Sequence, residues 1–279
     1  MIPRGVIQRG APLRSIAAFL VLVNGLFPAI WILLTSLKTE SELTRTPITY
    51  LPVAATLTNY VHAFHDQPLL RYLANSLIVA SASTALTLLV SVMAAYALAR
   101  LEISFRDLAL AAIIAVSTFP LVTLLVPLFQ TLRALGLLNT YVALVLPYTV
   151  LSLPICTLVL VSFFESIPVD LENAAMVDGS TRVGALVRVL LPLSAPGLAT
   201  AGILAFVNSW DEFLLALSFN SNPAYRTLPV GITLYQGEFA FPWPEISAAL
   251  VVGIVPVTAL IILFQQRILA GLTAGGIKG

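Results

Sequence analysis

Long uncharged stretches separated by charged residues dominate the chain, and their lengths predict membrane-spanning helices. Six stretches of 21 to 31 residues contain no Asp, Glu, Lys or Arg; they lie between Arg14 and Lys38, Arg71 and Arg100, Asp107 and Arg133, Arg133 and Glu165, Arg188 and Asp211, and Glu245 and Arg267. A transmembrane helix needs about 20 mostly apolar residues. The pattern therefore predicts an all-α membrane protein with six transmembrane helices.

Prolines interrupt three of these stretches, and we expect the third, fourth and fifth helices to be broken there. The prolines are Pro120 and Pro127, Pro147 and Pro154, and Pro192 and Pro196. A proline inside a membrane helix frees a carbonyl group and bends the helix, which neighbouring groups or water must compensate. Ordinary membrane-helix proline and a kinked, gated pathway both account for this pattern.

The composition excludes the main soluble classes. Of 279 residues, 59% are hydrophobic and 10% are charged, and the mean hydropathy is +0.98. A soluble domain has about 25% charged residues, so the chain is neither a soluble enzyme nor a disordered protein. The net charge of +1 gives no sign of a nucleic-acid partner, and the single cysteine, Cys156, cannot form an internal disulfide.

The distribution of basic residues predicts that both termini face the cytoplasm. With that orientation, nine Lys and Arg residues lie inside and five outside, as the positive-inside rule favours. The predicted parts are a cytoplasmic tail (1–14), one six-helix permease domain (15–268) and a second cytoplasmic tail (269–279). The domain includes a cytoplasmic loop (166–192) and two outer loops (38–71 and 219–245), which mix proline with aromatic residues and are expected to be ordered but irregular.

The cytoplasmic loop predicts a short helix–turn–helix. Pro168 followed by Asp170 and Glu172 is typical of a helix start, because proline suits the first position and acids favour the positive helix end. Gly179 suits a left-handed helix end, and Ser180 is expected to cap a second helix. That helix carries Arg182 and Arg188. An amphipathic connector resting on lipid headgroups is the alternative.

Three separated motifs resemble one transporter family. The run Asn173-Ala174-Ala175 to Asp178-Gly179, followed by Leu191-Pro192, resembles the EAA motif of importer permeases in ATP-binding-cassette (ABC) systems. The run 208–213 (NSWDEF) and the C-terminus 271–279 (GLTAGGIKG) resemble the carbohydrate, maltose-type branch, and in particular the second permease of a trehalose importer. The chain departs from the motif at Asn173, where the family usually has Glu, so a salt bridge from that position to the ATPase is not expected.

The resemblance implies a type I importer permease fold in the cell membrane and transport of a sugar, such as trehalose or a maltose-like disaccharide, by ATP-driven alternating access. The implied partners are a homologous second permease, a homodimeric cytoplasmic ATPase, an extracytoplasmic sugar-binding protein and the lipid bilayer. The residues implied to couple the loop to the ATPase are Asp170, Glu172, Asn173, Ala174, Ala175, Asp178, Gly179, Arg182 and Arg188. The tail residues implied to dock on the ATPase are Gly275, Gly276 and Lys278.

A polar face is predicted in the fifth span. Asn208, Asp211 and Glu212 are spaced i, i+3, i+4 and would share one side of a helix. Carboxylates in a membrane helix are costly unless they face water or a partner. We expect them to accept hydrogen bonds from sugar hydroxyls, with Trp210 offering its ring to the sugar; an interfacial aromatic belt or a contact to the second permease are the alternatives.

The second outer loop is expected to contact the binding protein through Gln236, Gly237, Glu238, Phe239 and Phe241. A packed cap of proline and aromatic residues on the helices is the alternative, as a frayed terminus is for the C-terminal tail.

The chain itself is predicted to have no catalytic, cofactor or metal site. No Gly-x4-Gly-Lys-Ser/Thr phosphate loop occurs, so ATP and magnesium are expected to bind the partner ATPase. His62 and His65 are interpreted as an ordinary pair in a loop. The rival functions are a permease for another solute, and a self-contained channel or ion-coupled carrier, which would leave the loop and tail motifs unexplained.

Overall fold

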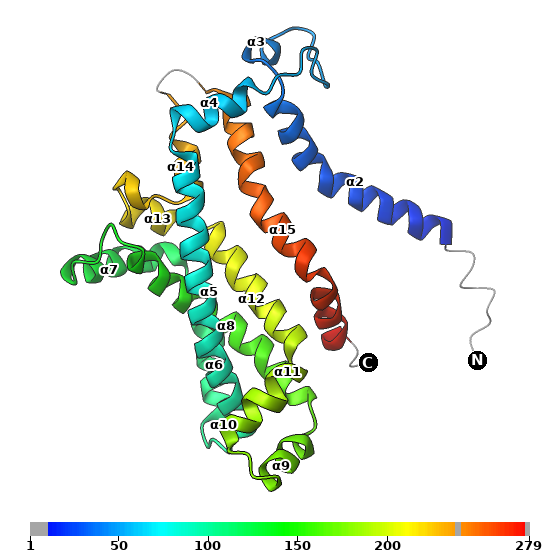
Figure 1. The fold of residues 1–279 in the computed structure, drawn as a ribbon, viewed down its shortest axis with the longest axis vertical. Coiled ribbons are helices and arrows are strands. Elements are labelled where there is room, and N and C mark those ends of the chain that lie inside the picture. The colour runs from blue at the N-terminus through cyan, green and yellow to red at the C-terminus, as the bar shows by residue number, and fades with distance from the viewer. Residues whose placement is uncertain (1–10, 238–240, 277–279) are drawn as a thin grey trace. The chain divides into compact units, whose positions relative to one another are not determined.

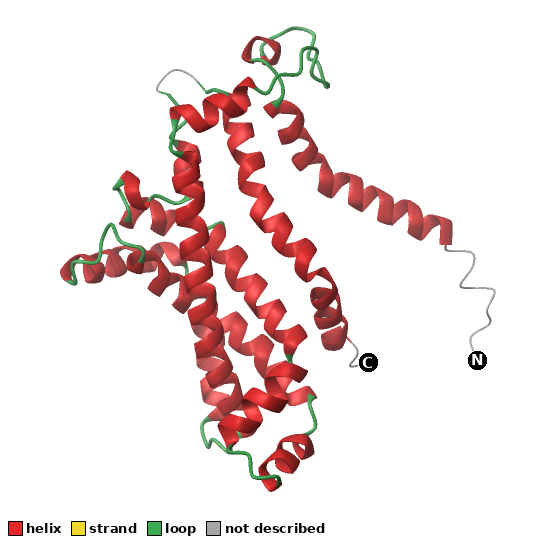
Figure 2. Ribbon diagram, viewed as in Figure 1, coloured by secondary structure: helices red, strands yellow, loops and turns green. Residues whose placement is uncertain are grey.

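The computed structural model describes residues 11–237 and 241–276, and the side chains of 15–237 and 241–266. These residues form helices and connecting segments without strands (Figure 2). Four helices are long and apolar enough to cross a membrane: α2 (Ala11–Ser36), α5 (Leu69–Arg100), α8 (Val142–Ser166) and α15 (Trp243–Gly276). The number rises to six if each of two sharply bent helix pairs is one span. The all-α prediction is confirmed for the described residues, whereas the count of six depends on these pairs.

The first bent pair joins α6 (Arg106–Ser117) to α7 (Leu121–Ala134) at an angle of 92°. The break is at Pro120, which has no N–H to donate and which disfavours helical geometry at the preceding Phe119. The predicted interruption of the third stretch is therefore present.

The second bent pair breaks at Ser194, between Pro192 and Pro196, with an angle of 82°. The helices before the break are α10 (Arg182–Ala185), the π-helical turn η1 (Leu186–Leu190) and α11 (Leu191–Leu193); α12 (Ala195–Trp210) follows it. The expected break in the fourth stretch is wrong, because α8 continues as one helix past Pro147 and Pro154. A proline removes a hydrogen bond and bends a helix without necessarily ending it.

The shorter elements connect these spans (Figure 1). They are α3 (Glu40–Leu43), α4 (Thr58–Asp66), α9 (Val169–Val177), α13 (Leu214–Phe219), the 3-10 turn η2 (Pro223–Tyr225) and α14 (Leu228–Thr233). The chain divides into two compact units, one of residues 1–69 and 232–254 and one of residues 70–231 and 255–279.

Close contact between α8 and α12 organises the core of the second unit. Gly197 of α12 lies against Phe163 of α8 so closely that a Cβ atom would come within 2.4 Å of the ring. Only glycine permits this approach. The helices bury small and branched side chains around it: Ala95, Cys156, Leu160, Phe164, Ala201 and Ala205. Small residues are typical of helix contacts in membranes because they let backbones approach.

A second apolar cluster in this unit holds α7, α8 and α13 together. Tyr148, Leu215 and Phe219 are its large buried members. Beside it, Asn75 of α5 donates to the carbonyls of Ala224 and Arg226, at 3.0 and 2.8 Å. These contacts fix the segment that follows α13, and the predicted polar face of the fifth span lies just before α13.

In the first unit, the segment predicted to be irregular is built around buried polar groups and includes α3 and α4. Lys38 is 2% exposed; its ammonium group donates to the carbonyl of Thr49 and lies 5.2 Å from the centre of the Trp31 ring. Burial opposes ionisation of Glu42, yet the pKa of this carboxyl is lowered overall, because it accepts hydrogen bonds from Val53 N and Thr49 Oγ1 and lies near the positive charge of Lys38.

Candidate functional site

The predicted helix–turn–helix is present between α8 and the second bent pair. Helix α9 begins after Pro168 and ends at Asp178, and Gly179 has a φ of +89°. Gly179 N donates to Met176 O at 3.1 Å and Ser180 N to Ala175 O at 2.9 Å, which is the bonding of a Schellman helix end. We call residues 168–190 the coupling hairpin.

The cap of its second helix differs from the prediction. Thr181, not Ser180, is the first capping residue, and its hydroxyl accepts a hydrogen bond from Gly184 N at 3.1 Å. Ser180 is instead used by the helix end before it, where its N–H completes the turn. Ser180 and Thr181 are adjacent and both suit a helix cap, so the sequence does not show which of them is the capping residue.

One predicted ATPase-facing residue, Glu172, points into the protein. Its carboxylate accepts a hydrogen bond from the Tyr96 hydroxyl, and the Nε of Arg100 lies 3.2 Å from its other oxygen. The Glu172 and Arg100 side chains are 7% and 5% exposed. Arg100 also donates to the carbonyl of Ile167 at 2.8 Å, just before α9. Glu172 therefore does not lie on the exposed surface of the hairpin, and it attaches the hairpin to the end of α5; its part in coupling stays a prediction.

The other predicted coupling residues lie at or near the surface of the hairpin. Asp170, Asn173, Ala174, Asp178, Gly179, Arg182 and Arg188 are exposed, and Ala175 is half-buried. Sequence reasoning missed the apolar part of this surface, where Val177 is 87%, Val183 68% and Val169 51% exposed. An exposed apolar surface with charged neighbours is typical of a protein–protein contact.

Polar residues of the fifth stretch gather around an open hollow. Asn208, Asp211 and Glu212 line it together with Leu121, Leu204, Val207, Phe213 and Leu214, and its volume is about 610 Å³. Helix α12 ends at Trp210, so the three polar residues do not continue one helix face as predicted. They meet because the chain turns at Asp211, whose N–H still bonds to Val207 O at 3.0 Å. We call this the carboxylate hollow.

Two of the four predicted substrate-path residues are bound within the protein. Glu212 accepts hydrogen bonds from the Tyr148 hydroxyl at 2.5 Å and from the N–H groups of Leu215 and Ala216 at 2.8 and 3.2 Å, so it caps α13. Trp210 is 5% exposed and stacks on Phe206, with ring centres 5.7 Å apart. Asn208 and Asp211 are exposed in the hollow, and Asn208 donates to Ser152 Oγ at 3.1 Å.

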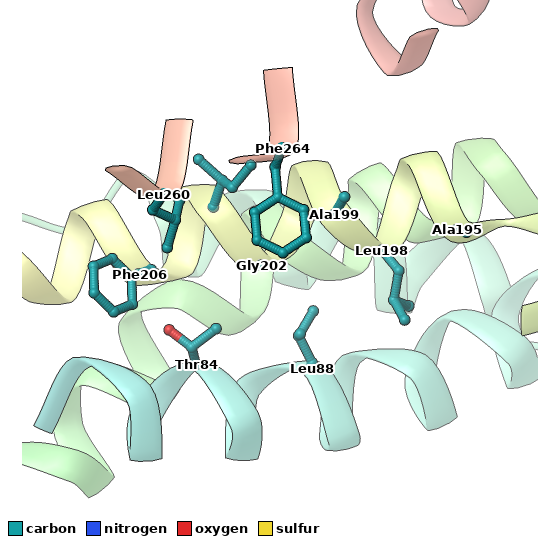
Figure 3. Close-up of a pocket in the computed structure, with 10 residues that line it drawn as sticks. Thr84, Leu88, Ala195, Leu198, Ala199, Gly202, Phe206, Leu260 and Phe264 are labelled. Carbon is teal, nitrogen blue, oxygen red and sulfur yellow. The ribbon is translucent and has the colours of Figure 1, made fainter. Parts of the chain in front are cut away.

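A separate cavity of about 320 Å³ in the second unit is almost wholly apolar (Figure 3). Thr84 and Leu88 of α5, Leu198, Gly202 and Phe206 of α12, and Leu260 and Phe264 of α15 line it. Its lining carries no charged group. Thr84 supplies the one side-chain hydroxyl in this lining, which is too few for a sugar with many hydroxyl groups, so the carboxylate hollow is the better candidate for that role.

The predicted binding-protein loop is described in part. Gln236, Gly237 and Phe241 are exposed, and Phe241 stacks on Trp243 with ring centres 6.1 Å apart. Glu238 and Phe239 lie outside the described residues, as does Lys278 of the C-terminal tail. Gly275 and Gly276 form the last residues of α15, so this part of the tail is helical.

Known proteins resemble the chain in sequence and in fold. Residues 88–270 match the family described as binding-protein-dependent transport system inner membrane component. The sulfoquinovosyl glycerol transport system permease protein SmoH of Agrobacterium fabrum is 74% identical over 270 residues, covering 97% of this chain and 95% of that protein. The trehalose/maltose transport system permease protein MalG of Thermococcus litoralis is 39% identical over 270 residues, covering 96% of each.

A solved structure has the same fold. A chain of a bacterial ABC transporter involved in the import of the acidic polysaccharide alginate superimposes with a TM-score of 0.80 at 22% identity, covering 96% of this chain and 99% of that one.

Proposed function

The chain belongs to the family of binding-protein-dependent transport system inner membrane components, and from this premise we propose that it is the permease subunit of an ATP-driven carbohydrate importer. The relatives support carbohydrate as the class of solute, since both are named for transport of glycosides. The 74% identity to the sulfoquinovosyl glycerol permease, against 39% to the trehalose/maltose permease, favours a sulfonated glycoside of glycerol over the disaccharide expected from the motifs.

The proposed complex has this chain and a second permease in the cell membrane, two ATPase subunits bound on the cytoplasmic side, and an extracytoplasmic sugar-binding protein. Each bent pair crosses the membrane once, which gives six spans with both termini in the cytoplasm. ATP and magnesium bind to the ATPase subunits, and this chain contributes no catalytic group.

The coupling hairpin carries the proposal, because it offers a docking surface on one side and a rigid attachment on the other. The exposed valines and charged residues of α9 and α10 suit insertion into a cleft of the ATPase. On the inner side, the Glu172–Arg100 ion pair attaches α9 to the end of α5. When the ATPase moves on binding ATP, the hairpin therefore moves α5, a helix of 32 residues, with it. ATP closes the ATPase, and the closed ATPase binds one conformation of the permease more tightly. The population of permease conformations shifts towards that one.

In the carboxylate hollow, Asp211 and Asn208 act on the passing sugar. An exposed carboxylate accepts hydrogen bonds from sugar hydroxyls, and these charge-assisted bonds are about twice as strong as neutral ones. The same charge repels a sulfonate, so the hydroxyl-bearing part of the substrate faces Asp211 and the sulfonate faces away. Glu212 keeps the hollow in shape through its bonds to Tyr148 and α13.

The test is uptake of labelled sulfoquinovosyl glycerol and of labelled trehalose by cells with and without this chain, with the partner subunits unchanged. Uptake of the sulfonated glycoside should require the chain, and excess unlabelled trehalose should not compete with it. Trehalose uptake that depends on the chain would contradict the sulfonated glycoside as substrate, but it would still agree with a carbohydrate importer. A purified chain that moves solute in vesicles without an ATPase would overturn the importer.

A further inference from the structure

Three side chains with metal-binding atoms meet in the first unit, outside every site described above. They are His62 and Asp66 of α4 and Glu245 in the first turn of α15, and one ligand atom of each lies within 4.8 Å of the other two. His62 and Asp66 are one helical turn apart, with Nδ1 and Oδ2 separated by 3.9 Å. Glu245 is distant in sequence, so only the fold brings it to this pair.

Contacts that do not involve these three groups hold α4 against residues 234–235, which precede α15 in the chain. The Tyr235 hydroxyl donates to the carbonyl of Ala63, which is completely buried and next to His62. Gln67 Nε2 donates to Leu234 O at 3.4 Å, just after Asp66. The backbone of α4 is therefore fixed against residues 234–235, in the same compact unit as the start of α15.

The donor set suits a divalent transition cation. Imidazole nitrogen with two carboxylate oxygens is a ligand combination that zinc accepts, at about 2.0 to 2.2 Å from the metal, and zinc sites of three protein ligands keep a position for water or a further group. The two carboxylates place negative charge beside the imidazole, and a divalent cation bound there would offset it. The three side chains are exposed or half-buried, so small rotations bring their atoms to the distances that zinc requires.

We propose that His62, Asp66 and Glu245 bind Zn²⁺ and that the ion joins α4 to the beginning of α15. The sequence interpretation paired His62 with His65, but His65 is not one of the three; its Nδ1 contacts Asp66 Oδ1 at 3.1 Å, and its side chain is 85% exposed. His65 therefore supplies a comparison on the same helix: its ring contacts the proposed ligand Asp66 but is not itself one of the three ligands.

The experiment measures Zn²⁺ binding to the full chain in its purified complex, after tag removal and chelator treatment, by competition with a chromogenic chelator. The complex should bind one Zn²⁺ for each copy of this chain. H62A and E245Q should each weaken that binding at least tenfold, and H65A, which removes only a contact to Asp66, should weaken it much less. The melting temperature of the complex should rise with Zn²⁺, fall again with EDTA, and not respond in H62A.

Because E245Q keeps the size and shape of the side chain, loss of binding with an unchanged melting temperature in EDTA excludes misfolding as the cause. D66N provides a second conservative variant with the same expected result. Equal Zn²⁺ binding by the parent, H62A and E245Q, binding lost only in H65A, or no binding by the parent would each overturn the site. None of these outcomes bears on carbohydrate transport, so the proposed function is tested separately.

Discussion

At the residue scale, Glu172 and Asn173 are neighbours in the chain with opposite surroundings. Glu172 is bound to Arg100 and Tyr96 inside the second unit, and Asn173 is exposed on the coupling hairpin. An acidic residue at position 173 is usual in the family motif, so Glu172 looks like its substitute in the sequence. The structure gives the two positions different roles: one holds the hairpin and the other faces outward.

Glu172→Ala should destabilise the protein much more than Asn173→Ala. Removing Glu172 leaves Arg100 buried without its partner, and breaking such a pair costs about 3–5 kcal/mol. An exposed substitution such as Asn173→Ala changes stability by about 0.5 kcal/mol or less. Thermal unfolding of the two purified variants, followed by tryptophan fluorescence, provides the comparison. Equal melting temperatures would contradict the burial of this pair.

The two carboxylates of the carboxylate hollow differ in the same way. Asp211→Asn should raise the KM for uptake about tenfold without changing stability, because a charge-assisted hydrogen bond to substrate contributes about 1.5–3 kcal/mol. Glu212→Gln should lower the melting temperature, since it weakens the cap of α13 and the bond from Tyr148. KM measured in proteoliposomes holding the full complex, together with melting curves, separates the two. An unchanged KM for Asp211→Asn would mean that substrate does not contact this residue.

At the scale of elements, the coupling hairpin is a small folded unit with its own helix end and cap. Its exposed face combines valines with charged residues; inside it α9 contacts α10 and η1, and Glu172 attaches α9 to the end of α5. The π-helical turn η1 carries Arg188 on this element, and such turns frequently mark functional positions in helices.

Val177→Asp should reduce binding of the ATPase while leaving the fold intact. Val177 is 87% exposed, so a charge there costs little in the isolated chain but is costly in an apolar cleft. Copurification of the ATPase with tagged chain measures the effect. Val53→Asp, at a valine 66% exposed in the first unit, is the matched control and should retain the ATPase. If the same amount of ATPase copurified with both variants, the hairpin would not be part of the docking surface.

The contact between α8 and α12 depends on one glycine. Gly197→Ala should destabilise the chain by at least about 1–3 kcal/mol, because the added Cβ meets the Phe163 ring at 2.4 Å. Phe163→Ala in the same chain should restore part of the loss by making room. Melting curves of the two single variants and the double variant test this coupling; strictly additive losses would show that the two residues do not meet.

At the scale of the whole molecule, the chain presents apolar surface that water cannot solvate. Side chains of α2 such as Phe19 and Val21 are 65% and 73% exposed, and within α2 only the end at Thr35 and Ser36 is buried among the described side chains. Lipid or another subunit must cover this surface. This agrees with a membrane protein that acts as part of a complex.

Deletion of residues 271–279 should impair stimulation of the ATPase while the complex still reaches the membrane. The deleted segment includes the last, helical turns of α15 at 271–276, which the motif resemblance places against the ATPase. ATP hydrolysis by the purified complex, with and without loaded binding protein, is the measurement. Substitution of Lys278 by Ala alone tests whether the charge or the length matters. Normal stimulation after the deletion would exclude the tail from coupling.

The sequence alone determined the class of the protein, its family and most of its helices. Runs of apolar residues, the Pro168 and Gly179 signals and the three motifs depend on local chemistry, so they predicted the helices, the coupling hairpin and the family. Tertiary structure decided the rest. The turn at Asp211 makes Glu212 a cap of α13, and the contact with α5 buries Glu172. Each of these depends on a partner distant in sequence or on the residue at which a helix ends. The spacing of residues within one segment does not predict either.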